Sequence, residues 1–257
     1  MVQKKQKEWF EQWNLVQDNE LFLFEDWISP TTLEDFRDKD VLECGSGGGQ
    51  HTYFVAPYAK SICAVDLNAV EIAKKRNNKF NNIDFIEDDI ANMKLEKKFD
   101  IVFSIGVIHH TDDPDKTVRN LIDHTKPSGK LIMWVYSKEG NFLVEHLVEP
   151  LRKIFLHKIS RKKLLLLSQS VTALMYLPIY SLYMLPINFL PFYEYFQNFR
   201  KLSFYRNTLN VFDKLNAPQV QFINKSRAKS WLNDNEFTNI HLSPYKGVSW
   251  RISGIKL

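Results

Sequence analysis

Glycines crowd the stretch VLECGSGGGQHT, residues 41–52, and the acid Glu43 stands just before them. The apolar residues that precede the glycines predict a short buried strand over 39–44. Glycines directly after a strand are typical of a turn in which the backbone closely approaches another group. Three partners fit such a turn: a phosphate, a dinucleotide, or only the helix that follows.

A second acid, Asp66, ends the next apolar run, 21 residues after Gly45. Ligands of a parallel sheet bind beyond the carboxyl ends of its strands, and a carboxylate there can accept hydrogen bonds from both ribose hydroxyls. The dinucleotide pattern GxGxxG would need its third glycine where Gln50 stands. Here Gly45, Gly47 and Gly49 follow one another two residues apart, which favours a different nucleoside ligand.

Two adjacent histidines, His109 and His110, follow the apolar run 99–106. Histidine takes up a proton near neutral pH, so either one suits the role of general base for a hydroxyl nucleophile. The alternative is that one of them caps the helix that begins near Asp112, or packs beside the ligand. No nucleophilic Ser/His/Asp or Cys/His set is evident. No carboxylate or cysteine stands at metal-ligand spacing from the histidines, so we expect no metal.

Strands and helices that would position these residues alternate through 39–135. We expect strands at 39–44, 61–67, 82–89, 99–106 and 130–137, and helices at 51–59, 68–80 (capped by Asn68) and 112–125, with a turn at KPSG (126–129). Such alternation with nearly continuous apolar strands indicates a parallel sheet covered on both faces. Further along, 225–237 predicts a helix, and 238–245 and 247–257 predict two strands of a hairpin.

The E-x-G-x-G-x-G pattern that starts at Glu43 resembles the first motif of class I S-adenosylmethionine (SAM)-dependent methyltransferases. FDIVFSIGVIHHTDDP resembles the fourth-strand motif of their small-molecule group, which includes the ubiquinone and menaquinone enzymes, and LIDHTKPSGKLIMWVY resembles the segment leading into the fifth strand. The resemblance covers about 39–137 and, more loosely, 225–257. It implies an α/β, Rossmann-like, seven-stranded and mostly parallel sheet with a C-terminal antiparallel hairpin and a helical insertion after strand five.

The resemblance also implies a SAM-dependent methyltransferase that acts on a small molecule. Oxygen is the expected acceptor atom, on a quinone-like, lipid-linked or saccharide substrate. The ribose would be bound by Asp66 and the adenine amino group by Asp89, with Asp88 where small residues are common. The expected cofactor-binding residues are Glu43, Gly45, Gly47, Gly49, Asp66, Leu67, Asp89, Ile90 and Ile105, and the catalytic candidates are His109 and His110.

Residues 141–224 interrupt the alternation, and within them 164–193 carry no charge. That length would suit a membrane span, but Pro178, Pro186 and Pro191 would break the helix. Six basic residues and no acid lie between Glu149 and Glu194. Three roles remain open for this insertion: a lid over the acceptor, a surface that contacts anionic lipid or a lipophilic substrate, or a homodimer interface.

The chain therefore divides into four expected parts: an N-terminal helical cover (1–38), a SAM-binding core (39–140), the helical insertion (141–224), and a C-terminal helix and hairpin that complete the core (225–257). Candidates for lining the ligand pockets outside the core are Phe24, Trp27, Tyr245, Lys246, Trp250 and Arg251.

The net charge of +4 comes from the segment between Glu149 and Glu194, whose six positive charges leave 4 − 6 = −2 for the rest of the chain. This distribution argues against nucleic acid as a partner. Cys44 and Cys63 are the only cysteines, and the N-terminus lacks the apolar core of a signal peptide, so we expect a cytoplasmic protein, with or without peripheral membrane contact.

Two other classes of function compete with the methyltransferase. A nicotinamide-dependent oxidoreductase is disfavoured by Gln50 and by the glycine spacing. A non-catalytic, methyltransferase-like scaffold at a membrane is disfavoured by the intact glycine loop and Asp66, which a scaffold has no need to keep.

Overall fold

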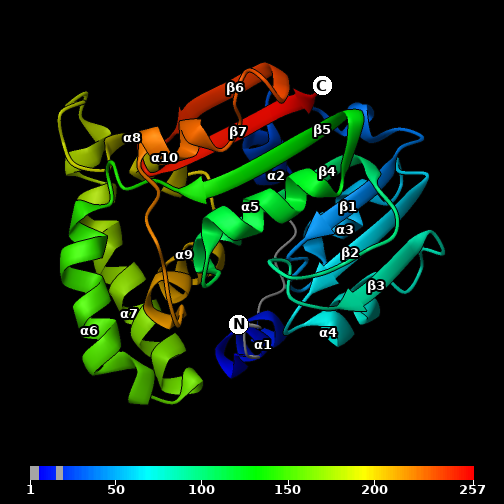
Figure 1. The fold of residues 1–257 in the computed structure, drawn as a ribbon. Helices are drawn as coiled ribbons and strands as arrows, with labels where there is room; N and C mark the ends of the chain where they lie inside the picture. Colours follow the sequence, from blue (N-terminus) through cyan, green and yellow to red (C-terminus); the bar gives the residue numbers. More distant parts are fainter. Residues whose placement is uncertain (1–5, 16–19) are drawn as a thin grey trace.

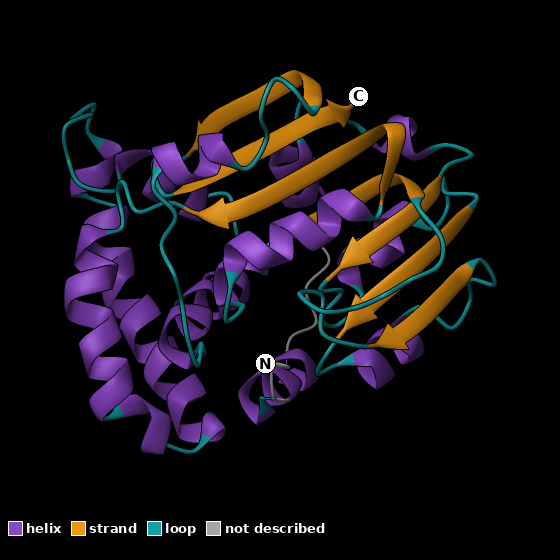
Figure 2. Ribbon diagram, in the orientation of Figure 1, coloured by secondary structure: helices purple, strands orange, loops and turns teal. Residues whose placement is uncertain are grey.

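A seven-stranded sheet forms the centre of the computed structural model, which describes residues 6–15 and 20–257 (Figure 2). The strands are β1 (Asp40–Cys44), β2 (Ser61–Asp66), β3 (Ile83–Glu87), β4 (Phe99–Ile105), β5 (Thr125–Tyr136), β6 (Phe237–Tyr245) and β7 (Ser249–Lys256). Their order is β3-β2-β1-β4-β5-β7-β6. The first five pair in parallel, and β7 pairs antiparallel with both β5 and β6. The predicted fold class is confirmed.

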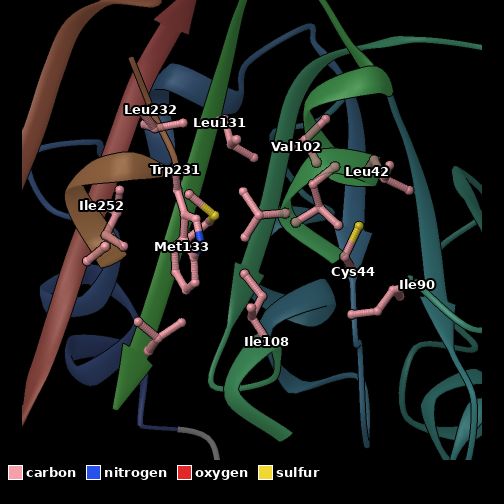
Figure 3. Packing of buried hydrophobic residues seen from close by; sticks show 14 of the residues in the cluster. Leu42, Cys44, Ile90, Val102, Ile108, Leu131, Met133, Trp231, Leu232 and Ile252 are labelled. Carbon is pink, nitrogen blue, oxygen red and sulfur yellow. The ribbon is translucent and has the colours of Figure 1, made fainter. Parts of the chain in front are cut away.

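Both faces of the sheet are buried, which explains the nearly continuous apolar strands. On β5, Leu131 and Met133 point to one side, where they pack with Trp231 (Figure 3). Ile132, between them, packs on the opposite side with Phe103. Residues of α5 (Pro114–Asp123) and α10 (Lys225–Ser230) complete the first of these cores, and residues of α2 (Leu21–Ile28) and α3 (Gln50–Val55) complete the second.

The remaining helices are α1 (Lys7–Leu15), α4 (Val70–Arg76), α6 (Glu149–Ile154), α7 (Arg161–Ile179), α8 (Tyr193–Phe199) and α9 (Phe204–Asn216). Short 3₁₀ turns are η1 (Leu33–Phe36), η2 (Ile108–His110), η4 (Leu156–Lys158) and η5 (Leu182–Met184), and a π-helical turn, η3 (Val144–Val148), leads into α6. In Figure 1, α6 and α7 lie beyond the arrowhead of β5. The insertion thus stands next to the carboxyl end of β5, with a small core of its own around Ile179, Phe199 and Val211.

The apolar insertion folds into several short helices and one longer one. α7 contains Pro178 as its penultimate residue and ends at Ile179. Because proline has no backbone N–H, one hydrogen bond of this last turn is missing. None of the helices in 6–15 and 20–257 combines the length and the apolar character needed to cross a membrane.

Three local predictions are wrong. Asn68 does not cap α4, because its side-chain oxygen accepts a hydrogen bond from the Gln6 amide (2.7 Å) and the helix starts only after Ala69. KPSG is not a separate turn but belongs to β5, where the pairing with β4 jumps in register. The predicted helix 225–237 ends at Ser230, because Asn233 accepts hydrogen bonds from Asn235 and Phe237 and so holds a turn.

Candidate active site

The glycine loop packs tightly against the segments that face it. Gly45 (φ +84°) and Gly47 (φ +52°) adopt left-handed backbone conformations. A Cβ atom at Gly45 would lie 2.5 Å from the Val107 side chain, and one at Gly47 would lie 2.6 Å from the Trp13 indole. Only glycine therefore fits at these two positions, and the loop backbone forms a cradle at the end of β1.

Asp66 holds this loop in place. One of its carboxylate oxygens accepts a hydrogen bond from the Gly47 amide (2.8 Å), and the other accepts from the amides of Asn68 and Ala69 (both 2.8 Å). Burial raises the pKa of Asp66, against the lowering effect of these three hydrogen bonds. The side chain thus fixes the glycine loop and also presents an acceptor at the pocket wall.

A pocket with about 580 Å³ of open space lies between this loop and the ends of β2 and β3; we refer to it as the cofactor pocket. Six of the expected cofactor-binding residues line it: Gly45, Gly47, Asp66, Leu67, Asp89 and Ile90. Asp88 also lines it. Asp89 is almost fully buried and accepts hydrogen bonds from Ala91 and Asn92, so part of its carboxylate is used to hold its own turn.

The other three expected cofactor-binding residues are not among the described residues that line the cofactor pocket. Glu43 lies beneath the loop, where it accepts a hydrogen bond from the Thr52 hydroxyl. Gly49 caps α3, and its carbonyl accepts a hydrogen bond from the side chain of Asn77, the C-cap residue of α4 (2.9 Å). Ile105 lines the neighbouring pocket instead.

The N-terminal helix α1 supplies two tryptophans that the sequence reasoning missed. Trp9 and Trp13, one turn apart, both line the cofactor pocket. Their spacing of four residues, which places both side chains on one face of a helix, was the signal in the sequence that could have identified them. In Figure 1, α1 lies between the insertion and the ends of β2 and β3. The expected N-terminal cover therefore contacts the pocket through α1, whereas Phe24 of α2 is fully buried in the core.

A second pocket, which we call the acceptor pocket after the role proposed below, has about 860 Å³ of open space and shares Trp9, Trp13, Gly45, Gly106 and Val107 with the cofactor pocket. The two pockets are therefore contiguous.

The far wall of the acceptor pocket comes from the insertion. Arg206, Asn210 and Asp213 lie on one face of α9 and line this pocket. Asp213 accepts hydrogen bonds from the Tyr136 hydroxyl and from the Gln12 amide (both 2.8 Å). The same contacts tie the insertion to the end of β5 and to α1.

The two histidines have different surroundings. His109 is fully buried, its Nδ1 accepts a hydrogen bond from the Tyr136 amide (3.3 Å), and burial lowers its pKa well below the ordinary range. Within the described part of the chain it lines neither pocket. His110 does line the cofactor pocket. Its Nδ1 donates to the Gln219 carbonyl (2.7 Å) and its pKa is lowered by burial, so the neutral ring carries its lone pair on Nε2.

His51, which the sequence reasoning missed, lines the acceptor pocket and stacks on Phe24 with 4.9 Å between ring centroids. Its Nδ1 lies 3.9 Å from an oxygen of Glu43. Burial lowers the pKa of His51 to about 3 and raises the pKa of Glu43 to about 8, so both groups are uncharged near pH 7. The contact is therefore not an ion pair. Nowhere in 6–15 or 20–257 do three His, Cys, Asp or Glu residues gather as metal ligands would.

Beyond the acceptor pocket lies an outer pocket of about 630 Å³, lined in part by Trp27, Tyr136, Asn210, Tyr245 and Lys246. The other two candidates from the last hairpin lie elsewhere. The Trp250 indole is buried and donates to the Ile223 carbonyl, and Arg251 donates to Ser243 and to the Asp26 carbonyl.

Comparison with known proteins gives one family match and several partial relatives. Residues 42–133 match the sequence family described as a methyltransferase domain. A ubiquinone biosynthesis O-methyltransferase from Schizosaccharomyces pombe is 28% identical over 109 residues, which is 40% of this chain and 40% of that protein. A tRNA U34 carboxymethyltransferase from Ruthia magnifica is 33% identical over 111 residues, 39% of this chain and 34% of that protein. The matches thus span well under half of these relatives.

Solved structures resemble nearly the whole chain at low identity. A Pyrococcus horikoshii protein superposes with a TM-score of 0.57 and 16% identity, covering 96% of this chain and 99% of that one. Magnesium protoporphyrin IX methyltransferase from Synechocystis, solved with bound S-adenosylhomocysteine (SAH), gives a TM-score of 0.52 and 12% identity, covering 98% of this chain and 94% of that one. At these identities the likeness establishes a shared fold.

Proposed function

Because this chain contains a class I SAM-dependent methyltransferase domain, we propose that it transfers the methyl group of SAM to a small-molecule acceptor. The observation that carries the proposal is the pair of contiguous pockets at the carboxyl ends of the strands. One is bounded by the glycine loop and Asp66, and the other by the polar face of α9.

The chemistry of the cofactor pocket fits SAM. Asp66, Asp88 and Asp89 line it, and no lysine or arginine of the described residues does. Three acids suit the positively charged sulfonium and amino groups of SAM, whereas the pyrophosphate of a dinucleotide would be repelled. The glycines let the loop backbone approach Val107 and Trp13 closely at the edge of this pocket, since a Cβ at Gly45 or Gly47 would collide with these side chains.

When bound, SAM supplies an electrophilic methyl carbon on its sulfonium, and this chain's residues position the partners. Asp66 binds the ribose hydroxyls, and Asp89 or Asp88 the adenine amino group. Trp9 and Trp13 cover the pocket and exclude water.

His110 is the proposed general base for a hydroxyl acceptor. It lines the cofactor pocket, and its ring centroid lies 6.0 Å from that of Tyr136, which lines the acceptor pocket. The hydrogen bond from Nδ1 to the Gln219 carbonyl leaves Nε2 as the nitrogen that takes up the proton. The buried His109 packs its ring against the ring of Tyr136 and so supports this arrangement.

The first prediction concerns ligand choice. In calorimetric titrations we expect SAM and SAH to bind with micromolar dissociation constants and NAD to give no measurable heat, because the acids of the cofactor pocket repel a pyrophosphate. Turnover with a panel of phenolic, lipid-linked and saccharide hydroxyl acceptors should follow. Binding of NAD alone would establish the oxidoreductase instead. Binding of SAH without turnover on any acceptor would favour the scaffold.

We further propose that the protein is cytoplasmic and that its insertion contacts an anionic membrane surface. Large apolar side chains are exposed on it, among them Leu174 (74%), Leu177 (78%) and Phe189 (89%). The basic residues Lys162 and Lys163 lie exposed at the start of the same helix, α7. Apolar groups beside lysines are typical of a helix that lies in a lipid interface.

This proposal predicts that the protein pellets with vesicles containing phosphatidylserine and stays in solution with phosphatidylcholine alone, and that salt releases it. The double variant Lys162→Glu/Lys163→Glu should lower the bound fraction about tenfold or more, at roughly 1 kcal/mol per basic residue. The matched control is Lys74→Glu/Lys75→Glu on α4, two adjacent exposed lysines outside the insertion. Equal binding to both vesicle types would overturn the membrane contact.

A further inference from the structure

The insertion contains an open apolar groove with about 740 Å³ of space, solvent at its mouth included. Its exposed wall is apolar throughout. One side is formed by Leu143 and Leu147 near η3, and the other by Met175 of α7, Phe196 of α8 and Val211 of α9.

This groove shares lining residues with the pockets of the proposed active site. Asn210 lines the groove, the outer pocket and the acceptor pocket alike. Phe192, Tyr195 and Lys214 line both the groove and the outer pocket. The groove therefore adjoins the outer pocket, and the outer pocket adjoins the acceptor pocket.

Helix α9 divides this space into a polar and an apolar part. Arg206 and Asp213 face the acceptor pocket, whereas Val211 and Leu215, on the opposite side of the helix, face the groove. Lys214 lies between the two faces, and its ammonium group donates to the Tyr195 hydroxyl (3.0 Å). An amphipathic helix that lines a cavity on both faces matches a ligand with a polar end and an apolar end.

The groove also exposes apolar surface that a ligand would cover. Leu143 is 42% exposed and Leu147 is 59% exposed, although both lie on a concave wall. Apolar surface in a concave site is typical of ligand binding and gains stability when it is removed from water.

We propose that the groove binds a single hydrocarbon chain carried by the acceptor, whose polar head lies in the acceptor pocket. This inference rests on the proposed function for the identity of that head as the methyl acceptor. It narrows the substrate class to amphiphiles and excludes free saccharides.

The test uses n-alkyl-β-D-glucosides with six, eight and ten carbons as probes, below micelle formation, titrated into the SAH-saturated protein. Each added methylene should tighten binding about fourfold, because each leaves water for an apolar wall. Leu147→Glu, which places a charge in the groove, should weaken the ten-carbon probe at least tenfold. Leu151→Glu is the matched control, since Leu151 is similarly exposed (54%) and close in sequence but does not line the groove within the described residues.

The outcomes separate the possible occupants. If both variants weaken the probe equally, the probe binds general apolar surface and the proposal is overturned. If Leu147→Glu dissociates a dimer seen by light scattering, a second copy covers the groove and the proposal is likewise overturned. The SAH affinity of the wild type tests the proposed function. The SAH affinity of each variant, compared with that of the wild type, shows whether the variant is folded. Chain-length dependence without SAH binding would support the groove and refute the methyltransferase, and SAH binding without chain-length dependence would do the reverse.

Discussion

Asp66→Asn should weaken SAH binding by a factor of roughly ten to a hundred or more. Hydrogen bonds to a charged group contribute about 1.5–3 kcal/mol each, and the proposed ribose contacts lose their charged acceptor. The amide also creates a local conflict. Both oxygens of Asp66 accept from backbone amides, one from Gly47 and the other from Asn68 and Ala69, so the new NH₂ group must face a donor on one side.

The measurement is calorimetric titration with SAH, together with the melting temperature of each variant. Asp84→Asn is the matched control, an exposed carboxylate on the neighbouring strand β3 that lines none of the pockets described above. Its SAH affinity should equal that of the wild type. An Asp66→Asn variant that binds SAH within twofold of the wild type would remove Asp66 from the cofactor site.

The second large effect is expected at the base. With the acceptor identified by the screen, His110→Ala should lower kcat about a hundredfold to ten-thousandfold, the usual contribution of a positioned base. The sign of the pH dependence follows from the lowered pKa of His110. The neutral ring is active, so wild-type kcat should stay flat near neutrality and fall as the pH drops through that lowered pKa. The variant should lack this acid limb.

His241→Ala is the control, because His241 lies on β6 and bonds Ser243. It should leave kcat and its pH profile unchanged. If His110→Ala keeps its acid limb or loses less than fivefold in kcat, the acceptor needs no base from this residue, and the proposal of oxygen as acceptor atom loses its main support.

The core of the fold was predictable because its signals are local. The strand β1 with Glu43, the left-handed glycines and Asp66 lie within residues 40–66, and their spacing reflects one turn and one crossover between neighbouring strands. The errors at Asn68 and Asn233 share one cause. Their side chains form hydrogen bonds that compete with the helix, and only the folded neighbours determine which bond forms.

The acceptor side was not predictable in the same way. The side-chain amide of Gln12 donates a hydrogen bond to Asp213, although the two residues are 201 positions apart in the sequence. The polar residues of α9 have the spacing of an ordinary solvent-facing helix, and only its position beside the carboxyl end of β5 turns that face into a pocket wall. His51 stood in the quoted glycine stretch, but a histidine in the first turn of a helix does not reveal which cavity it faces.

The segment that follows α9 and contains Gln219 and Gln221 connects the insertion to His110, the proposed general base. Gln219 accepts from His110 through its carbonyl and donates to the His110 carbonyl through its side chain, while the Gln221 amide donates to the His109 carbonyl. The segment that follows the proposed acceptor lid therefore also sets the tautomer of the ring that would deprotonate the acceptor. In protein engineering, a lid grafted from another enzyme would bring its own specificity, but it would support catalysis only if the graft ended before this segment. Recombination at the boundary of α9 would keep Gln219 and its two contacts with His110, whereas recombination a few residues later would replace that residue.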